Sequence, residues 1–257
     1  MPRVAAVIVT HDSAEFLEHT LASIDQQTRP PDIRIAVDDY STDTTVDVLT
    51  RYGFDTQVAT TSATDVTTRI AQNFQQALRT AQQSEAETVI LGDHDDLWHR
   101  DRIEHQLDLL QRHRNVAMLA SDGFLIDSHG AAVPGTIRSH FPIPADFNDR
   151  NLRQQLTYAL RHSIATGGAC ALRPEALQHW SVPPGWLHDR WWSLAAVRAG
   201  RFWSASTAVI DYRLSPDQQV GLDTAEQQAP ARWLVGKARQ VGLTAQRVRD
   251  VTRLTRV

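Results

Sequence analysis

Short apolar runs rich in β-branched residues alternate along the chain with longer stretches in which apolar residues recur every three or four positions. The first pattern is typical of strands buried on both faces, and the second of helices with one buried face. The apolar runs predict strands at residues 4–9, 33–37, 88–91, 116–120, 202–205 and 208–212, and a short strand after residues 166–168. The periodic stretches predict helices that begin near Ser13 and Ser41, and helices at residues 66–81, 101–113, 151–161 and 187–198.

Strands that alternate with helices across short loops predict an open α/β sheet, mostly parallel and built from right-handed crossovers. In such sheets, ligands bind beyond the carboxyl ends of the strands. Polar groups follow three of the predicted strands: Thr10-His11, Asp38-Asp39 and the DHDD segment at residues 93–96. We therefore expect these groups to meet at one edge of the sheet.

The regular alternation fades after Asp127. Residues 130–148 contain three prolines and predict a long loop, and the segment from residue 230 predicts one or two helices. From residue 231 onward, seven cations stand against Asp250 alone: Arg232, Lys237, Arg239, Arg247, Arg249, Arg253 and Arg256. This segment fits three readings: an amphipathic helix on an anionic membrane surface, a dimerisation arm, or a helix packed on the body.

Composition narrows the class of protein. A chain of 257 residues predicts one large domain, or one domain with an appendage. The single cysteine, Cys170, excludes a disulfide framework and fits a reducing compartment such as the cytoplasm. No apolar run is long enough to cross a bilayer, and the apolar run near the N-terminus reads as a strand, not a signal peptide. A net charge of −4 gives no general sign of nucleic-acid binding.

The acidic cluster at residues 93–96 has two interpretations. Asp93, Asp95 and Asp96 follow an apolar strand, and carboxylates this close together repel unless a cation neutralises them. Mg²⁺ typically binds one or two carboxylates together with substrate phosphate oxygens. The alternative is an acidic turn that caps the next helix. Asp39 likewise either caps a helix or accepts a hydrogen bond from a ligand N–H, and Ser41 and Asp43 are free to serve as caps in its place.

Several motifs resemble glycosyltransferase family 2, and they occur in the family's order. The segments that carry this resemblance are VAAVIVTHD at 4–12, VDDYSTD at 37–43, NF at 73–74, GDHDDLW at 92–98, TG at 166–167, WLHDRWW at 186–192 and DYR at 211–213. The acidic motif is similar to DQDDxW, which marks a subgroup that includes rhamnosyl and galactofuranosyl transferases of polysaccharide assembly. The resemblance implies a GT-A fold, with a Rossmann-like nucleotide-binding half followed by an acceptor half.

The resemblance also implies a role for each matching residue. On the donor side, Thr10 and the backbone near His11 would lie against the nucleobase, and Asp39 would accept a hydrogen bond from the base N3–H. Arg69 would reach the pyrophosphate, and Asp96 would face the sugar. Asn73 would also lie in the donor site. Asp95 would bind Mg²⁺ or Mn²⁺, with Asp93 near the metal and the ribose. On the acceptor side, Asp189 would be the general base, with His188, Trp191, Thr166 and Gly167 nearby.

These roles imply an inverting transfer of a sugar from a nucleotide-diphospho-sugar to an acceptor hydroxyl. A uridine or deoxythymidine donor is favoured because both bases carry an N3–H. The acceptor would be a glycan, a lipid-linked molecule or another hydroxyl compound. The expected divisions are a donor half at 1–128, an acceptor half at 129–221, and a basic helical extension at 222–257 that offers peripheral membrane contact or a homodimer interface.

The chain departs from the family pattern at three positions. The family often has Asn where Asp12 stands, Gly where Tyr40 stands, and His where Ser215 stands. That His would assist the metal or the pyrophosphate, so the third metal ligand is open, with Asp217 and Arg213 as candidates. Two alternatives follow: a non-catalytic domain that binds nucleotide-sugars, and a sugar nucleotidyltransferase-like enzyme. A sugar nucleotidyltransferase would need a loop rich in Gly and carrying a Lys after the first strand. Residues 10–15 contain neither Gly nor Lys, which disfavours this alternative.

Overall fold

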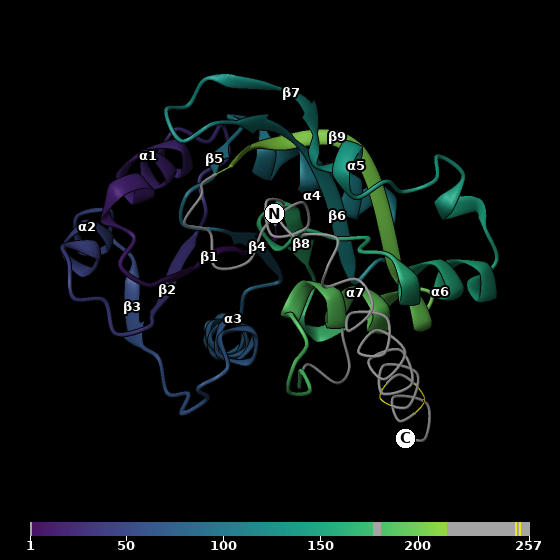
Figure 1. The fold of residues 1–257 in the computed structure, drawn as a ribbon, viewed down its shortest axis with the longest axis horizontal. Helices are drawn as coiled ribbons and strands as arrows, with labels where there is room; N and C mark the ends of the chain where they lie inside the picture. Colours follow the sequence, from purple (N-terminus) through teal and green to yellow (C-terminus); the bar gives the residue numbers. More distant parts are fainter. Residues whose placement is uncertain (1, 177–180, 215–249, 251, 253–257) are drawn as a thin grey trace, which may run out of the picture.

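The computed structural model describes residues 2–176, 181–214, 250 and 252. One sheet of nine strands forms the centre of the described part, in the order β3-β2-β1-β4-β8-β6-β9-β5, with β7 paired to β6 (Figure 1). The strands are β1 Val4–Thr10, β2 Ile33–Asp38, β3 Asp55–Val58, β4 Thr88–Gly92, β5 Leu97–Trp98, β6 Met118–Ile126, β7 Ala132–Thr136, β8 Cys170–Leu172 and β9 Phe202–Arg213. The α-helices are α1 Ala14–Asp25, α2 Thr45–Arg51, α3 Val66–Gln83, α4 Arg102–Arg112, α5 Ile137–His140, α6 Leu152–Arg161 and α7 His188–Arg198, and the 3₁₀ turns are η1 Phe147–Asp149, η2 Gly167–Ala169 and η3 Pro174–Ala176.

The sheet is mostly parallel, as the sequence predicts. β1 pairs in parallel with β2 and β4, β2 with β3, and β6 with β9. β8 runs antiparallel between β4 and β6, so those two strands point the same way. The carboxyl ends of β1, β2, β4 and β6 therefore lie at the same edge of the sheet.

Helices cover both faces of the sheet because the buried strands alternate their side chains between two cores. On one face, Val7 of β1 and Leu91 of β4 belong to the same core cluster as Phe74 of α3 and Trp192 of α7. On the other face, Ile8 belongs to a cluster that contains residues of α1, α2 and α4. The expected α/β architecture is confirmed.

The structure differs from the sequence prediction in its shorter or less regular strands. β3 and β5 have four and two residues, too few for a periodic signal. The predicted loop at 130–148 contains β7, α5 and η1, and the two strands predicted after residue 202 form one continuous strand, β9. For the four strands β3, β5, β7 and β9, pairing with a neighbouring strand supplies order that local sequence does not.

The predicted division after residue 128 falls between β6 and β7, and the strands on either side of it belong to one sheet. The helices predicted from residue 230 and the extension at 222–257 lie outside the described residues, except for residues 250 and 252. These divisions stay a prediction. Within the described residues, no helix is both long and apolar enough to cross a membrane.

Candidate active site

A cleft of about 740 Å³ opens at the carboxyl edge of the sheet. Asp39 follows β2, Asp95 follows β4 and Asp189 lies in the first turn of α7, and all three line this cleft. Its volume lies within the range of small-molecule binding sites. The expected meeting of strand ends is therefore confirmed, and a carboxylate about a hundred residues further along the chain joins them.

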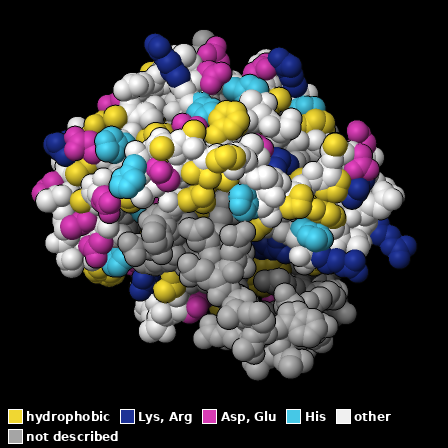
Figure 2. Space-filling view, turned by 45° about the horizontal axis from the view of Figure 1, so that its top comes forward, with side chains coloured by type: hydrophobic (Ala, Val, Ile, Leu, Met, Phe, Trp, Pro, Cys, Tyr) yellow, Lys and Arg dark blue, Asp and Glu magenta, His cyan; other side chains and the backbone are white. Residues whose placement is uncertain are grey.

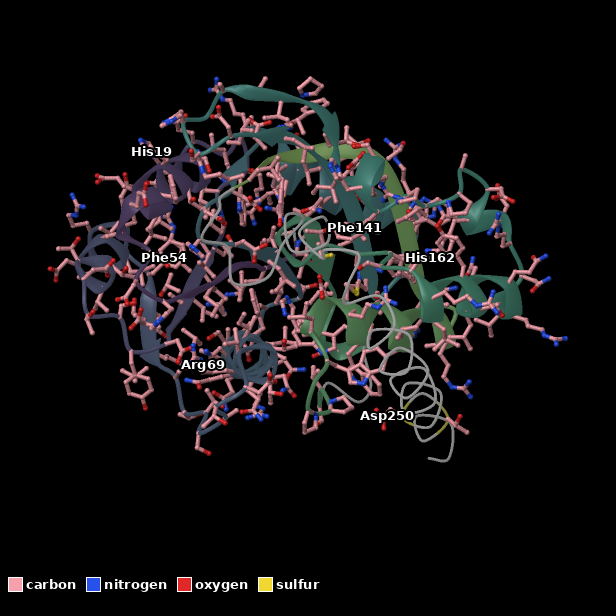
Figure 3. The ribbon with its side chains drawn as sticks, in the orientation of Figure 1. His19, Phe54, Arg69, Phe141, His162 and Asp250 are labelled. Carbon is pink, nitrogen blue, oxygen red and sulfur yellow. The ribbon has the colours of Figure 1, made fainter. Side chains whose placement is uncertain are left out.

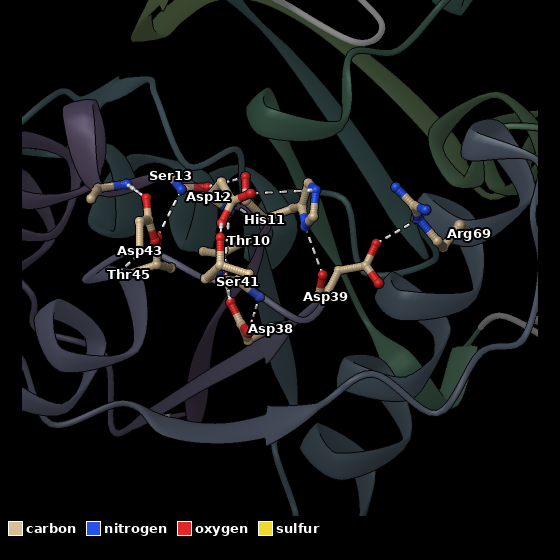
Figure 4. Close-up of polar contacts among 12 residues, drawn as sticks. Thr10, His11, Asp12, Ser13, Asp38, Asp39, Ser41, Asp43, Thr45 and Arg69 are labelled. Carbon is tan, nitrogen blue, oxygen red and sulfur yellow. Dashed lines mark hydrogen bonds and ion pairs between the residues drawn. The ribbon is translucent and has the colours of Figure 1, made fainter.

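Asp38 holds the first two loops of the cleft together. Its carboxylate accepts hydrogen bonds from Thr10 Oγ1 at 2.9 Å, and from the backbone N and Oγ of Ser41 at 2.9 and 2.6 Å (Figure 4). Asp43 meanwhile accepts from the backbone N of Ala14, in the first turn of α1, and Ser13 makes no capping bond with its side chain. Asp43 also accepts from the backbone N of Thr45, the first residue of α2, so it serves the starts of both helices, and Asp39 is not needed as a cap.

Asp39 forms an ion pair with Arg69 of α3. The Nε of Arg69 lies 2.7 Å from Asp39 Oδ2, although the Nε–H lacks hydrogen-bond geometry (Figure 4). The backbone carbonyl of Asp39 also lies 2.7 Å from Nδ1 of His11. A carboxylate has about four acceptor positions, so this one accommodates Arg69 and a ligand N–H together. Arg69 itself does not line the cleft, so its direct approach to a pyrophosphate stays a prediction.

Two non-glycine residues adopt left-handed backbone conformations beside the cleft. Asp12 has a φ of 44° and Tyr40 a φ of 59°. These are two of the three positions where the chain departs from the family pattern, which has Asn and Gly there. Both of those residues tolerate this conformation better than Tyr does. The backbone thus keeps the turn geometry although the side chains differ.

Hydrogen bonds to the main chain fix the orientation of the acidic turn after β4. Asp93 Oδ2 accepts from the backbone N of Gly168 at 3.1 Å, and Asp96 Oδ1 accepts from the backbone N of Arg213 at 3.0 Å. Arg213 also donates from Nε to the carbonyl of Asp95 at 2.9 Å. Arg213, one of the two candidates to replace the family's His, therefore braces this turn from β9. Ser215 and Asp217 lie outside the described residues.

The acidic turn carries more negative charge than its surroundings neutralise. Burial, with the charges of Asp95 and Asp189, raises the pKa of Asp93 to about 7. Burial, with the charges of Asp95 and Asp93, also raises the pKa of Asp96 well above its usual value. Asp96 Oδ2 is buried and has no hydrogen-bond partner. An additional cation bound at this turn would relieve the repulsion.

Arg102 supplies part of the balancing charge from behind the turn. It is fully buried at the start of α4, lies 4.0 Å above the ring of Trp98, and donates to the carbonyl of Leu91 at 2.7 Å. Burial lowers its pKa to about 9, while Asp96 and Asp93 act in the opposite direction. The sequence analysis missed this residue because an Arg in the first turn of an amphipathic helix gives no sign of burial.

The Thr-Gly-Gly turn at residues 166–168 joins the acidic turn to α7. The backbone N of Gly167 donates to Asp189 Oδ2 at 3.1 Å, as Gly168 does to Asp93. A Cβ on Gly168 would lie 2.6 Å from oxygens of both Asp93 and Asp96, and a Cβ on Gly167 would lie 2.7 Å from His188 Nε2. Only glycine lets this turn approach both sides of the cleft, so Gly168 belongs with the predicted Gly167.

Asp189 has the properties of a base. Its two oxygens accept from the backbone N of Gly167 and, at 2.6 Å, of Arg190, which fixes the carboxylate in the cleft. Burial raises its pKa to about 6. A carboxylate with this pKa is ionised at neutral pH and is a stronger proton acceptor than an ordinary aspartate. The arrangement can therefore deprotonate a hydroxyl group placed beside Asp189.

His188 lies next to the base as a neutral ring. It is buried, stacks on Phe74 with 3.8 Å between ring centroids, and burial lowers its pKa to about 3. Neither of its ring nitrogens has a hydrogen-bond partner among the described residues. Asn73 also lines the cleft. Neither the nitrogen nor the oxygen of its buried side-chain amide has a hydrogen-bond partner among the described residues. Buried polar groups without partners are uncommon, and both of these groups are placed to hydrogen-bond a water or a ligand in the cleft.

The cleft brings together most of the residues that the resemblance selected. Those that line it are Thr10, His11, Asp39, Asn73, Asp93, Asp95, Thr166, Gly167, His188 and Asp189. Asp96 is buried beneath the surface of the cleft and Arg69 stands behind Asp39. Trp191 was expected on the acceptor side of the cleft, but it does not line the cleft. It is buried in the same core cluster as its neighbour Trp192, since both faces of α7 at these positions pack against other elements. Trp186 lines the cleft in its place.

The acidic turn suits a hard divalent cation. Its donors are carboxylate oxygens, and the raised pKa values show that these carboxylates are short of positive charge. Within the described residues, no three His, Cys, Asp or Glu side chains form a complete metal site. Metal binding by Asp95 and Asp93 therefore stays a prediction.

Comparisons with solved structures bear on the fold. Staphylococcus aureus TarS 1–349 in complex with UDP has a TM-score of 0.57 and 17% identity, and the match covers 83% of this chain and 61% of that one. Glucosyl-3-phosphoglycerate synthase from Mycobacterium tuberculosis, in complex with Mn²⁺, UDP and glucosyl-3-phosphoglycerate, has a TM-score of 0.56 and 15% identity, with 84% and 73% covered. The chain thus spans about three fifths of the TarS fragment. No curated protein matches it by sequence.

The family is established by sequence. The model of glycosyl transferase family 2 matches residues 5–180, which is more than half of the chain and includes β1, the acidic turn and the Thr-Gly-Gly turn. The subgroup suggested by the acidic motif has no separate support. The GT-A-like arrangement of the sheet agrees with this match. The chain therefore belongs to glycosyl transferase family 2.

Proposed function

We propose that the protein transfers a sugar from a nucleotide-diphospho-sugar to an acceptor hydroxyl, with inversion at the anomeric carbon. The observation that carries this proposal is the shared cleft, which places Asp39, Asp95 and Asp189 around one volume of about 740 Å³. The UDP bound to TarS and to glucosyl-3-phosphoglycerate synthase supports the same class of donor. The non-catalytic alternative predicts that the donor binds without any transfer of sugar.

The donor would lie between the ends of β1 and β2 and the acidic turn. Thr10, His11 and Asp39 would hold the base, and the N3–H of uracil or thymine would donate to the carboxylate of Asp39. Asn73, whose amide has no partner within the described residues, would bind the donor. Asp93 and Asp95 would hold Mg²⁺ or Mn²⁺, which supplies positive charge against the leaving diphosphate. The Mn²⁺ in glucosyl-3-phosphoglycerate synthase supports this choice.

The acceptor would enter from the side of α7. Asp189 would remove the proton of the attacking hydroxyl, and His188, which is neutral, would hydrogen-bond the acceptor beside it. Thr166, Gly167 and Trp186 would form the wall of this side. With Asp189 as the one base, on the face opposite the leaving group, the transfer is a single displacement that requires no carboxylate nucleophile and inverts the anomeric carbon. The narrower assignment to the DQDDxW-like subgroup of polysaccharide assembly, peripheral membrane contact and a homodimer stay predictions.

Thermal unfolding with a panel of nucleotide-sugars tests the proposal. A ligand at about a hundred times its Kd stabilises the folded state by about 2.7 kcal/mol, which raises Tm by roughly 5 to 10 °C for a chain of this size. In the presence of Mn²⁺, we expect UDP- or dTDP-sugars to produce such a shift, and GDP- and CMP-sugars to produce much less. The proposal fails if no nucleotide-sugar on the panel changes Tm.

The rate of transfer should depend on pH through Asp189. Burial raises the pKa of this carboxyl to about 6, and only its ionised form accepts a proton. With saturating donor and Mn²⁺, we expect kcat to be constant above about pH 7 and to fall about tenfold per pH unit below pH 6. A kcat that stays constant from pH 5 to pH 8 would contradict the role of Asp189.

A further inference from the structure

A second cavity lies on α6, outside the proposed active site. It has a volume of about 320 Å³ and is lined by one stripe of α6, from Arg153 to Arg161, with Arg150 and His162 at its two ends. Residues 150–174 contain four arginines and no Asp or Glu. In Figure 2, Arg and His side chains gather on the right-hand side of the molecule, the side on which Figure 1 places α6. We call this cavity the α6 groove.

The cations of the α6 groove differ in how far their charges are neutralised. Arg150 makes a two-point contact with Asp146, at 2.9 and 3.1 Å. Arg153 and Arg161 are exposed, and within the described residues neither guanidinium has a carboxylate partner. They lie eight residues apart on the same helix face, about 12 Å along its axis. Among the residues that the structure describes, the groove therefore presents two separated guanidinium groups without an ion pair.

The floor of the α6 groove is a fixed aromatic ring. Tyr158 stacks on His162 with 4.3 Å between ring centroids, and its hydroxyl donates to the carbonyl of Pro142 at 2.5 Å. The guanidinium of Arg150 lies 5.9 Å from the centroid of the same ring. The groove thus has an anchored aromatic ring with exposed arginines beside it, and Arg side chains bind phosphate and carboxylate groups through paired N–H donors.

The α6 groove leads to the acceptor side of the cleft. α6 ends at Arg161, and Ser163, Ala165 and Thr166 already line the cleft. Ser163 lies two residues after Arg161, a separation of at most about 7 Å. Figure 3 shows His162 at the end of α6 that faces the middle of the molecule. Arg190 of α7 lines the cleft and donates to the carbonyl of Leu160 in α6, so a hydrogen bond joins the helix that carries the groove to a residue of the cleft.

We propose that the α6 groove binds the part of the acceptor that extends away from the reacting hydroxyl, and that this acceptor is an anionic glycan carrying phosphate or carboxylate groups. The inference rests on the proposed function. An anionic acceptor would be repelled by Asp93, Asp95 and Asp189 in the cleft. Arg153 and Arg161 offset that repulsion by holding the charged groups of the chain at a distance from these carboxylates.

A membrane surface suits the α6 groove less well. Helices that lie on anionic membranes present a broad apolar face next to their cations. In α6 the apolar residues Leu156, Ala159 and Leu160 pack toward the core, and only Leu152 is exposed. The cations instead line a shallow depression, and no broad apolar face lies beside them.

The test compares two double variants of the 257-residue chain. R153Q/R161Q removes the uncompensated charges of the groove, and R79Q/R114Q removes two exposed arginines elsewhere. The probes are inorganic polyphosphate, polygalacturonate, neutral dextran and vesicles that contain phosphatidylglycerol. Binding is measured by calorimetry at low and at physiological salt, because exposed ion pairs weaken as salt rises. Donor-induced shifts in Tm are recorded for every variant.

We expect the parent to bind at least one anionic polymer and not dextran. An exposed ion pair changes a binding constant by about threefold, so R153Q/R161Q should bind the polymer about tenfold more weakly and R79Q/R114Q within about twofold of the parent. Equal weakening in both double variants, no weakening in R153Q/R161Q, or binding to vesicles alone would overturn the inference. Because donor binding is measured separately, a failure of the proposed function appears in the Tm shifts and not in polymer binding.

Discussion

Asp189→Asn should abolish sugar transfer while leaving donor binding near normal. In the parent, the backbone N of Gly167 donates to Asp189 Oδ2 at 3.1 Å. Asparagine keeps the shape of the side chain and an oxygen that accepts this hydrogen bond, but it cannot accept a proton. General base catalysis contributes typically 10²- to 10⁴-fold, and we expect a loss of about 10³-fold in kcat. Initial rates with a neutral sugar acceptor measure kcat, and calorimetry measures the Kd of the donor.

Asp47→Asn is the matched control for this variant. Asp47 is an exposed residue of α2 that does not line the cleft, and its replacement removes the same charge from the surface. We expect the control to transfer sugar at the parental rate. If Asp189→Asn also transfers at the parental rate, Asp189 is not the base. If Asp189→Asn loses donor binding as well, the carboxylate acts on the donor and not on the acceptor.

Asp95→Asn should remove the response to divalent cations. The acidic turn holds three carboxylates within four residues, and burial with mutual repulsion raises the pKa of Asp93 to about 7. A cation bound there stabilises the folded protein, and the stabilisation should largely vanish when one ligand becomes a neutral amide. We expect the Mn²⁺-induced increase in Tm to disappear and kcat/KM to fall about 10³-fold, since a metal supplies several kcal/mol to a reaction of this kind.

Asp12→Asn is the control for Asp95→Asn. Asp12 lines the same cleft, and asparagine tolerates its φ of 44° and still accepts from the backbone N of Thr42. It removes one negative charge from the cleft without changing the acidic turn, so Mn²⁺ should raise Tm as it does in the parent. Equal loss of the Mn²⁺ effect in both variants would show that only the total charge of the cleft matters, which contradicts a specific role for Asp95.

Pattern alone was enough to predict the order of the main elements. β1 and β4 contain continuous apolar runs, β2 is an apolar run interrupted by Arg34, and α3 and α4 have strong helical periodicity, so each element carries its own signal. The carboxyl ends of parallel strands share an edge, so Thr10, Asp39 and Asp95 were expected to meet. Asp189 and Thr166-Gly167 joined this set through the family resemblance, since no local pattern marks them.

Other features depend on contacts between distant segments and have no local signature. β5 exists because it pairs with β9, more than a hundred residues away in sequence. Arg102 is buried because α4 packs it beneath the acidic turn, and Gly168 is required because two carboxylates approach the same backbone position. Trp191 shows the reverse error: an aromatic residue beside the base was expected in the cleft and lies in the core.

The sequence by itself determined the layered α/β fold, the edge of the sheet where ligands would bind, and the acidic residues at that edge, because strand and helix periodicity and strand direction are local properties. Only the tertiary structure decided that Asp38 braces the loops while Asp39 lines the cleft, and that Arg102 lies buried behind the acidic turn. It also decided that the α6 groove lies next to the cleft. Burial and electrostatic repulsion depend on every neighbour in space, and those neighbours come from parts of the chain that no local pattern connects.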